Sequence, residues 1–174
     1  AVVLRVQNNL ARKSNRIMKR IFDIVATVCG GLLILPILAI VAVLIYLDSP
    51  GPIVFGHKRV GQGGKEFPCY KFRSMVPNAQ EALEVYLKEN PAAREEWERD
   101  FKLKDDPRVT RIGKFLRKTS LDELPQLWNV LVGDMSLVGP RPIVRDEIVK
   151  YGDYINDFYL VPPGITGVWQ VSGR

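Results

Sequence analysis

One uninterrupted apolar run constrains this chain more than any other feature. From Ile24 to Leu47 the sequence IVATVCGGLLILPILAIVAVLIYL contains no charged residue. As a helix, these 24 residues would extend roughly 36 Å, longer than the roughly 30 Å hydrocarbon core of a bilayer. The run is too long and too internal for a signal peptide, and no small-residue cleavage site follows it. We therefore expect a membrane-embedded helix, with a buried helix of a soluble protein as the alternative.

Charge on the two flanks of the run bears on its topology. Both flanks are basic, with Arg12, Lys13, Arg16, Lys19 and Arg20 before it and Lys58, Arg59, Lys65, Lys71 and Arg73 after it. By the positive-inside rule both flanks prefer the cytoplasm, which a straight span does not permit. Pro36 offers another course, because proline removes a backbone donor and breaks or kinks a helix. Arms of about 17–18 Å on either side would each reach into one leaflet only. The residues alone leave a single span and a re-entrant hairpin both open.

The composition limits which residue types can supply catalytic groups. With 174 residues and a net charge of +6, the chain can form one domain with a core and should have an anionic partner. Two cysteines, Cys29 and Cys69, favour a reduced protein over a disulfide scaffold. His57 is the only histidine, and its GHKR context suggests a polar surface or phosphate contact. Catalytic groups are therefore expected among carboxylates and cations. Neither end looks like a natural terminus, so we expect a portion of a longer polypeptide.

After the apolar run the pattern predicts a small hairpin and then helices. The runs Ile53–Phe55 and Phe67–Phe72 flank a glycine-rich turn at Gly61–Gly64. Two charged helices are expected at Asn78–Glu89 and Ala92–Leu103, interrupted at Pro91, with Trp97 and Phe101 forming a packed stripe.

Two later segments have amphipathic spacing. In DPRVTRIGKFLRKTS, the apolar residues Val109, Ile112 and Leu116 recur at helical spacing, and Phe115 lies close to their face. The rest of that segment is cationic, which suits a helix in a membrane interface, although an ordinary surface helix gives the same pattern. Leu124, Leu127, Trp128 and Leu131 form a second stripe, which either core packing or an interfacial position would explain.

Two adjacent carboxylates, Asp122 and Glu123, follow the basic segment. SLDE resembles a capping box with Ser120 as N-cap and Glu123 three residues later. Pro125 disturbs that register, since it disfavours a helical Leu124, so a helix starting near Pro125 fits better. Both acids would then lie in the turn ahead of the helix. Helix capping and catalysis remain equally supported by this local pattern.

The cations near these acids favour a phosphate-bearing substrate. Arg117 is five residues upstream, Arg141 lies between two prolines in GPRP, and Lys71 and Arg73 come from the KFR segment. The arginine guanidinium matches phosphate oxygens in pairs. A carboxylate can attack phosphorus as a nucleophile, and a second can hold Mg²⁺.

Three long motifs, occurring in order, resemble one family. KFRSM, the segment from DPRVTRIGKFLRKTSLDELP through GDMSLVGPRP, and PGITGVWQVSGR are similar to the bacterial sugar transferases, the monotopic phosphoglycosyl transferases. The likeness is greatest to undecaprenyl-phosphate galactose or glucose phosphotransferases, and it extends from about Lys19 to Arg174. The resemblance implies a re-entrant membrane helix broken at Pro36, interfacial helices, and transfer of a sugar 1-phosphate from a UDP-sugar to undecaprenyl phosphate with release of UMP.

The resemblance also implies roles for the site residues. Asp122 would be the nucleophile that forms a covalent phosphosugar intermediate in a ping-pong reaction. Glu123 and Asp122 would hold Mg²⁺. Lys71, Arg73, Arg117 and Arg141 would bind phosphate and substrate.

The expected architecture is α+β and mainly helical. It comprises a basic flank over 1–20, a re-entrant membrane helix over 21–47, and a catalytic domain over 48–174 that faces the cytoplasm of a bacterial inner membrane. The expected partners are a UDP-sugar, undecaprenyl phosphate and membrane lipids, with no nucleic acid and with a homodimer left open. A basic, membrane-anchored scaffold without catalysis is the alternative function.

Overall fold

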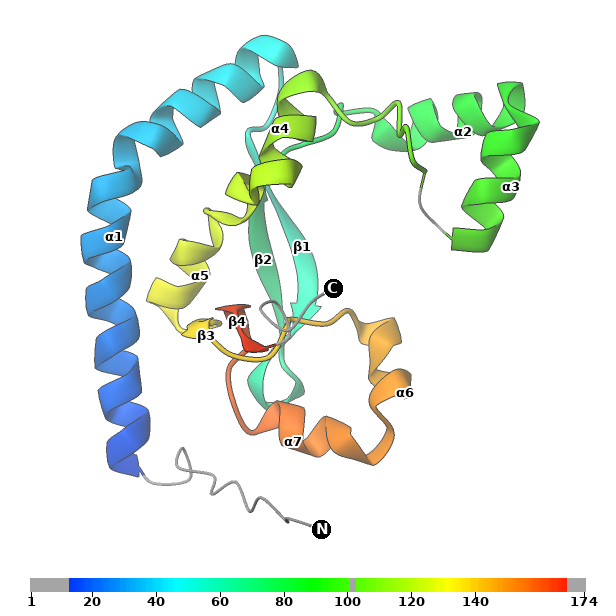
Figure 1. The fold of residues 1–174 in the computed structure, drawn as a ribbon. Coiled ribbons are helices and arrows are strands. Elements are labelled where there is room, and N and C mark those ends of the chain that lie inside the picture. Colours follow the sequence, from blue (N-terminus) through cyan, green and yellow to red (C-terminus); the bar gives the residue numbers. More distant parts are fainter. Residues whose placement is uncertain (1–12, 101–102, 169–174) are drawn as a thin grey trace. The chain divides into compact units, whose positions relative to one another are not determined.

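A computed structural model describes residues 13–100 and 103–168 (Figure 1). In its first part are α1 (Lys13–Asp48), β1 (Val54–Val60), η2 (Gln62–Gly64), β2 (Glu66–Phe72), α2 (Ala79–Glu89) and α3 (Pro91–Asp100). In its second part are α4 (Arg111–Thr119), η3 (Leu121–Glu123), α5 (Gln126–Val132), β3 (Ser136–Val138), η4 (Arg145–Glu147), α6 (Ile148–Tyr151), η5 (Gly152–Tyr154), α7 (Ile155–Tyr159) and β4 (Gly164–Thr166). Two small sheets, β1–β2 and β3–β4, accompany the helices, which confirms the mainly helical α+β class.

The chain forms two compact units built from alternating segments. The first unit contains Ala1–Leu35, Gly56–Tyr70 and Gln126–Arg174, and the second contains Pro36–Phe55 and Lys71–Pro125. The boundary within α1 falls between Leu35 and Pro36, so each unit contains one arm of this helix.

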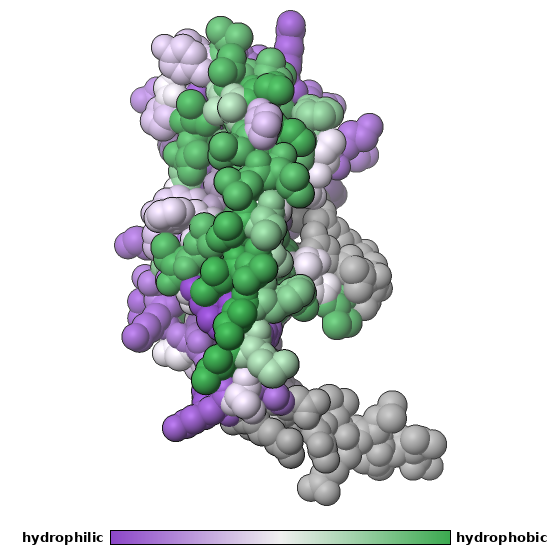
Figure 2. All heavy atoms as spheres, turned by 90° about the vertical axis from the view of Figure 1, so that its left-hand side faces the viewer, coloured by the Kyte–Doolittle hydropathy of each residue, from purple (hydrophilic) through white to green (hydrophobic). Residues whose placement is uncertain are grey.

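Helix α1 is long and apolar enough to cross a membrane, and only 11% of its most apolar stretch is buried. A core helix of a soluble protein would be mostly buried, so this exposure indicates membrane association. Exposed apolar side chains run along both arms, including Phe22 and Leu33 on the first and Ile40 and Leu47 on the second (Figure 2). The helix is assigned without interruption through Pro36, so the structure does not confirm the predicted break there.

The second unit packs its arm of α1 against the basic helix α4. Val41 and Ile45 of α1, Phe72 of β2 and Leu116 of α4 are buried together. Helix α4 begins at Arg111, with the Thr110 side chain accepting a hydrogen bond from the Gly113 N–H at 2.9 Å. The predicted helical stripe is therefore wrong at one end, because Val109 precedes the helix and pairs with Met75 in an isolated bridge.

Close packing in the second unit depends on one glycine. A Cβ atom at Gly113 would lie 2.0 Å from the backbone oxygen of Ser74. Because backbone cannot move aside as a flexible side chain can, only glycine permits this approach. It brings α4 against the segment that follows β2, where Arg73 and Ser74 lie.

The first unit contains two apolar clusters and a parallel strand pair, whose Leu137 and Ile165 pack against one of the clusters. Phe67, Cys69, Val130 and Met135 form one cluster, and Val60, Ile143 and Phe158 form the other. Strands β3 and β4 pair in parallel with Ser136 opposite Gly164 and Val138 opposite Thr166.

Polar contacts attach the first arm of α1 to this unit. Asp23 is 3% exposed and accepts hydrogen bonds from the Ser136 hydroxyl at 2.8 Å and the Leu137 N–H at 3.2 Å. Arg20 donates to the backbone oxygens of Val130 and Leu131, near the end of α5. The helix is therefore held here by charged groups, at the edge of its apolar run.

The predicted hairpin and the predicted charged helices also have counterparts in the structure. The β1–β2 hairpin with its glycine turn is confirmed, and so is the presence of two charged helices, but α3 begins at Pro91 itself and the predicted end at Leu103 is wrong because Leu103 is not helical. The guanidinium of Arg108 lies 5.0 Å from the centre of the Trp97 ring. Phe101, the other member of the predicted stripe, lies outside the described residues, as do Arg12 and the segment from 169 onward.

Candidate active site in the second unit

The two candidate carboxylates lie on η3, the single 3₁₀ turn between α4 and α5. Ser120 ends α4 in the left-handed region, with φ 59°, and is the one non-glycine residue with positive φ among those described. The prediction that both acids precede a helix starting near Pro125 is confirmed, since α5 begins at Gln126. The capping-box alternative is wrong, because the Ser120 side chain forms no capping hydrogen bond.

The turn is fixed by the residues on either side of the acids. Leu121 and Leu124 pack against the cluster that contains Val41 and Ile45 of α1. The acids therefore project from a turn that is anchored directly to the second arm of the membrane helix.

Lys71 at the end of β2 joins the two acids. Its Nζ lies 2.8 Å from Oε1 of Glu123 and 3.9 Å from Oδ2 of Asp122. The side chains of Lys71, Asp122 and Glu123 are 25%, 14% and 26% exposed, so all three are mostly shielded but reachable from solvent. Of the predicted cations, Lys71 is the one in direct contact with the carboxylates.

The protein environment shifts the pKa of Asp122. Burial raises the pKa of the Asp122 carboxyl above its ordinary value, and the charge of Glu123 raises it further. Lys71 and, more weakly, Arg117 lower this pKa without cancelling the increase. An increase that comes from desolvation also means that the ionised carboxylate is poorly hydrated, which suits a nucleophile.

Arg117 and Arg73 line a neighbouring cavity of about 330 Å³. Arg117 donates from Nε to the Ser74 hydroxyl at 2.9 Å. Arg73 is 9% exposed and donates from Nη2 to the Ser49 backbone oxygen, while its Nε and Nη1 have no partner in the described part of the chain. Buried donors without partners are costly, so this pair of N–H groups is suited to an acceptor-rich ligand.

Arg141 belongs to the first unit, where it has a different neighbour. Its Nη1 lies 3.1 Å from Oε1 of Glu147, and its side chain is 48% exposed. Lys71, Arg73, Arg117, Asp122 and Glu123 thus all belong to the second unit, whereas the contact that the structure gives Arg141 is with Glu147 of the first unit. His57 is exposed on β1, with Nδ1 3.1 Å from the backbone oxygen of Lys58, as a surface histidine should be.

Sequence reasoning missed the buried polar residues Asn129 and Asp23. Asn129 is fully buried, donates to the Pro68 oxygen at 2.8 Å and accepts from the Tyr70 N–H at 3.0 Å. It holds α5 to β2 directly before Lys71. Core packing is the wrong explanation for the predicted stripe on α5, because Gln126, Asn129 and Val130 are the buried residues and Trp128 is 59% exposed. An interfacial position for the stripe stays a prediction. Asp23 could have been suspected as a lone acid adjoining an apolar run.

Comparison with known proteins identifies the family. Residues 14–174 match the family model described as bacterial sugar transferase. The chain belongs to the bacterial sugar transferase family. Among its relatives, it is 57% identical to the undecaprenyl-phosphate galactose phosphotransferase of Salmonella typhimurium over 173 residues, which cover 99% of this chain and 36% of that protein.

Other sugar transferases are also similar. The exopolysaccharide production protein ExoY of Sinorhizobium fredii is 48% identical over 91% of this chain and 70% of that protein. The UDP-glucose:undecaprenyl-phosphate glucose-1-phosphate transferase of Escherichia coli is 42% identical over 91% of this chain and 32% of that protein. The chain thus spans about a third of the length of the Salmonella and Escherichia relatives.

The expected magnesium ion can be tested against the residues of this sugar transferase. No group of three or more His, Cys, Asp or Glu side chains suited to a metal occurs among the described residues, which leaves the pair Asp122 and Glu123. Mg²⁺ usually takes one or two carboxylates together with waters and substrate phosphates. Two adjacent carboxylates beside the Lys71 ammonium fit this mode of binding.

Proposed function

We propose that this chain is the catalytic part of a membrane-bound phosphoglycosyl transferase. It transfers a hexose 1-phosphate from a UDP-sugar to undecaprenyl phosphate and releases UMP, as a first membrane step in the assembly of a surface polysaccharide or glycoconjugate. The observation that carries this proposal is the contact of Lys71 with Asp122 and Glu123 on a turn packed against α1. The relatives named as undecaprenyl-phosphate sugar phosphotransferases support the substrate classes.

In the first step, an Asp122 carboxylate oxygen attacks the sugar-bearing phosphorus of the UDP-sugar. The bond from this phosphorus to the oxygen bridging it to UMP breaks, and UMP leaves with that electron pair. An acyl phosphate that carries the sugar remains on Asp122. Lys71 holds the carboxylates in place before attack and offsets their mutual repulsion.

In the second step, a phosphate oxygen of undecaprenyl phosphate attacks the same phosphorus. The bond to the Asp122 oxygen breaks, which restores the carboxylate and yields the lipid diphosphate sugar. Leu121 and Leu124 anchor the turn to α1, so the acceptor phosphate can reach Asp122 while its chain stays in lipid. Bound Mg²⁺, held by Glu123 and Asp122, would neutralise charge on the diphosphate.

The arginines bind phosphate in this proposal. Arg73 and Arg117 line one cavity in the second unit, and two N–H groups of Arg73, which have no partner among the described residues, suit phosphate oxygens. Arg141 is a further phosphate ligand in this proposal. This role requires that substrate binding separates it from Glu147.

We further propose that α1 forms a re-entrant hairpin at Pro36, with both flanks and the catalytic domain in the cytoplasm. The position of Pro36 inside α1 supports this proposal, because proline removes a backbone donor and kinks or breaks a helix. Single cysteines at positions 2 and 90, in a background without Cys29 and Cys69, would test it in intact cells. Both should resist a membrane-impermeant thiol reagent until the cells are opened, and labelling of one of them from outside would contradict the hairpin.

The reaction is tested by trapping the intermediate. The complete protein, in membranes and with Mg²⁺, is incubated with a UDP-sugar in the absence of lipid acceptor, and Asp122 should gain the mass of a hexose phosphate. Asp122→Asn should abolish the adduct and lower UMP release by about 10³-fold or more, with membrane association unchanged. Undiminished turnover in Asp122→Asn would refute the proposed nucleophile. A panel of UDP-sugars, scored by UMP release, identifies the sugar.

A further inference from the structure

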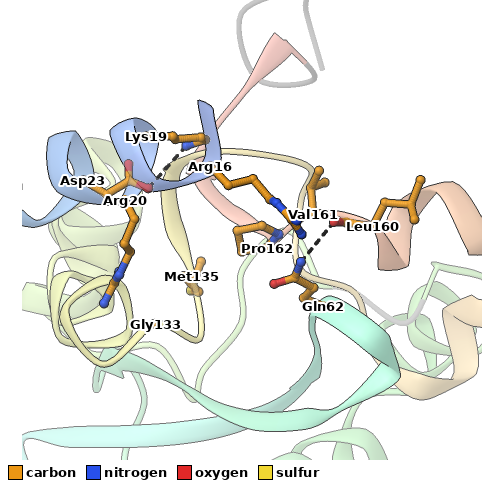
Figure 3. Close-up of a pocket in the computed structure, with 10 residues that line it drawn as sticks. All are labelled: Arg16, Lys19, Arg20, Asp23, Gln62, Gly133, Met135, Leu160, Val161 and Pro162. Atoms are coloured by element: carbon orange, nitrogen blue, oxygen red, sulfur yellow. Dashed lines mark hydrogen bonds and ion pairs between the residues drawn. The ribbon is translucent and has the colours of Figure 1, made fainter. Parts of the chain in front are cut away.

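A second cavity lies in the first unit. It has a volume of about 190 Å³ and is enclosed by the first turns of α1, the hairpin turn at Gln62, and the loop Leu160–Pro162 (Figure 3). One water needs roughly 15 Å³ by this kind of measure, so the cavity can hold a polyatomic group. None of its lining residues has a role in the proposed transfer reaction.

The cavity lining is cationic. Arg16, Lys19 and Arg20 face Asp23 as the one acid, so three positive charges stand against one negative charge. Two of these cations are engaged within the protein. Lys19 lies 3.3 Å from Asp23 and contacts Ser136, and Arg20 donates to backbone oxygens at the end of α5.

Arg16 differs from the other two cations. It is exposed, and among the described residues it has no hydrogen bond or ion pair. Figure 3 shows its side chain extending across the cavity toward Gln62 and Pro162. Gln62 itself donates to the Leu160 oxygen at 3.0 Å, which fixes that wall. A guanidinium that has no partner among the described residues and lines a cavity is suited to a phosphate group, whose oxygens it can bind in pairs.

The cavity lies where α1 becomes apolar. Ile17 and Ile21, beside Arg16 and Arg20, are 60% and 56% exposed and lead into the apolar run. Leu160, which is 56% exposed, and Val161 and Pro162 provide apolar walls on the other side. A ligand with a phosphate and acyl chains would bind the Arg16 guanidinium and also cover the apolar walls. Free phosphate would leave these walls uncovered.

We propose that this cavity binds the phosphate headgroup of an anionic phospholipid, with Arg16 as its principal ligand. This lipid is neither donor nor acceptor in the transfer reaction. It would attach the cytoplasmic end of α1 to the membrane and fix the depth of the first arm. The inference rests on the membrane placement of α1 and is independent of the chemistry at Asp122.

A photoactivatable phosphatidylglycerol tests the site. The complete protein is placed in phosphatidylcholine nanodiscs that contain about 10% of this lipid. After irradiation, the label should lie on the segment Leu160–Pro162. Arg16→Gln should reduce this labelling about tenfold, as expected for the loss of a charge-assisted hydrogen bond. Val161→Phe, which fills the cavity without changing charge, should reduce it as well.

Lys13→Gln is the matched control. It removes one positive charge from the same helix end, outside the cavity, and should leave the labelling within about twofold of the wild type. An equal loss in Lys13→Gln and Arg16→Gln would show a diffuse electrostatic attraction and overturn the site. Suppression of labelling by inorganic phosphate at equal concentration would show a soluble anion as ligand and overturn the lipid. Failure of the protein to enter nanodiscs would overturn the membrane placement as well, while intermediate formation at Asp122 could still be observed.

Discussion

The ammonium of Lys71 lies 2.8 Å from a carboxylate oxygen of Glu123, although the two residues are 52 positions apart. This contact also brings the ammonium within 3.9 Å of Asp122. The Lys71 ammonium therefore compensates both negative charges, and the site depends on the end of β2 as much as on the acidic turn.

Replacement of Lys71 by methionine tests whether its ammonium compensates the charges of Asp122 and Glu123. The loss of the ammonium leaves the acids with mutual repulsion, so the pKa of Asp122, already raised by burial, should rise further. We expect UMP release at neutral pH to fall about 10²-fold and its acid limb to move to higher pH. Lys118→Met, at an exposed position on α4, should leave both unchanged. An unaltered pH profile in Lys71→Met would show that Lys71 has no effect on the ionisation of Asp122.

Asp122→Asn should stabilise the protein near neutral pH. Because burial raises the folded-state pKa of Asp122 above 3.8, the unfolded chain ionises first as pH rises, and the fold loses stability across that interval. Asparagine removes this loss. Thermal unfolding in detergent should therefore show a higher Tm for Asp122→Asn at pH 7 and a shrinking difference below the ordinary carboxyl pKa. Asp153→Asn, an exposed position in η5, provides the comparison, and a lower Tm for Asp122→Asn at pH 7 would refute the argument.

Glu147→Gln should have the opposite effect on stability and destabilise the protein at neutral pH. Burial raises the pKa of Glu147, but the Val144 N–H, Arg141 and Arg59 outweigh it and hold the pKa below 4.5. The stability contributed by this carboxylate is present above the unfolded-state pKa and lost as pH falls through the folded-state value. Glu147→Gln should cost about 1 kcal/mol at pH 7 and nothing in strong acid. Asp146→Asn, the exposed neighbour, should be neutral, and a pH-independent effect of Glu147→Gln would contradict the assignment.

Gly113→Ala should be harmful even though alanine usually favours a helix by about 1 kcal/mol. The new methyl group would lie 2.0 Å from the Ser74 oxygen, which forces α4 away from the segment after β2. We expect a loss of about 2–4 kcal/mol in unfolding free energy, together with reduced UMP release because Arg117 loses its contact with Ser74. Lys114→Ala, one residue later on the exposed side, should be tolerated. A Gly113→Ala protein that is as stable as the wild type would show that the approach is not tight.

Local signals predicted the parts of the fold that depend on neighbouring residues. The glycine turn gave the β1–β2 hairpin, and Pro125 placed Asp122 and Glu123 ahead of α5. The contact of Lys71 with the acids could not be read from spacing, because it depends on how β2 packs beside η3. Asn129 was missed for a related reason: periodicity assumes that inward positions are apolar, whereas this amide replaces backbone partners that β2 lacks.

The alternation of segments between the two units has a consequence for biosynthesis. All of Pro36–Phe55 and Lys71–Pro125 has been made once the ribosome has passed Pro125, whereas the other unit still lacks α5, β3 and β4. Since compact units tend to fold as they are completed, the unit that carries Asp122 can assemble first, while the first arm of α1 waits for its partners. During that interval Asp23 and Arg20 have no Ser136 or α5 carbonyls to bind, so a nascent chain stalled near Pro125 exposes those charges at the membrane surface.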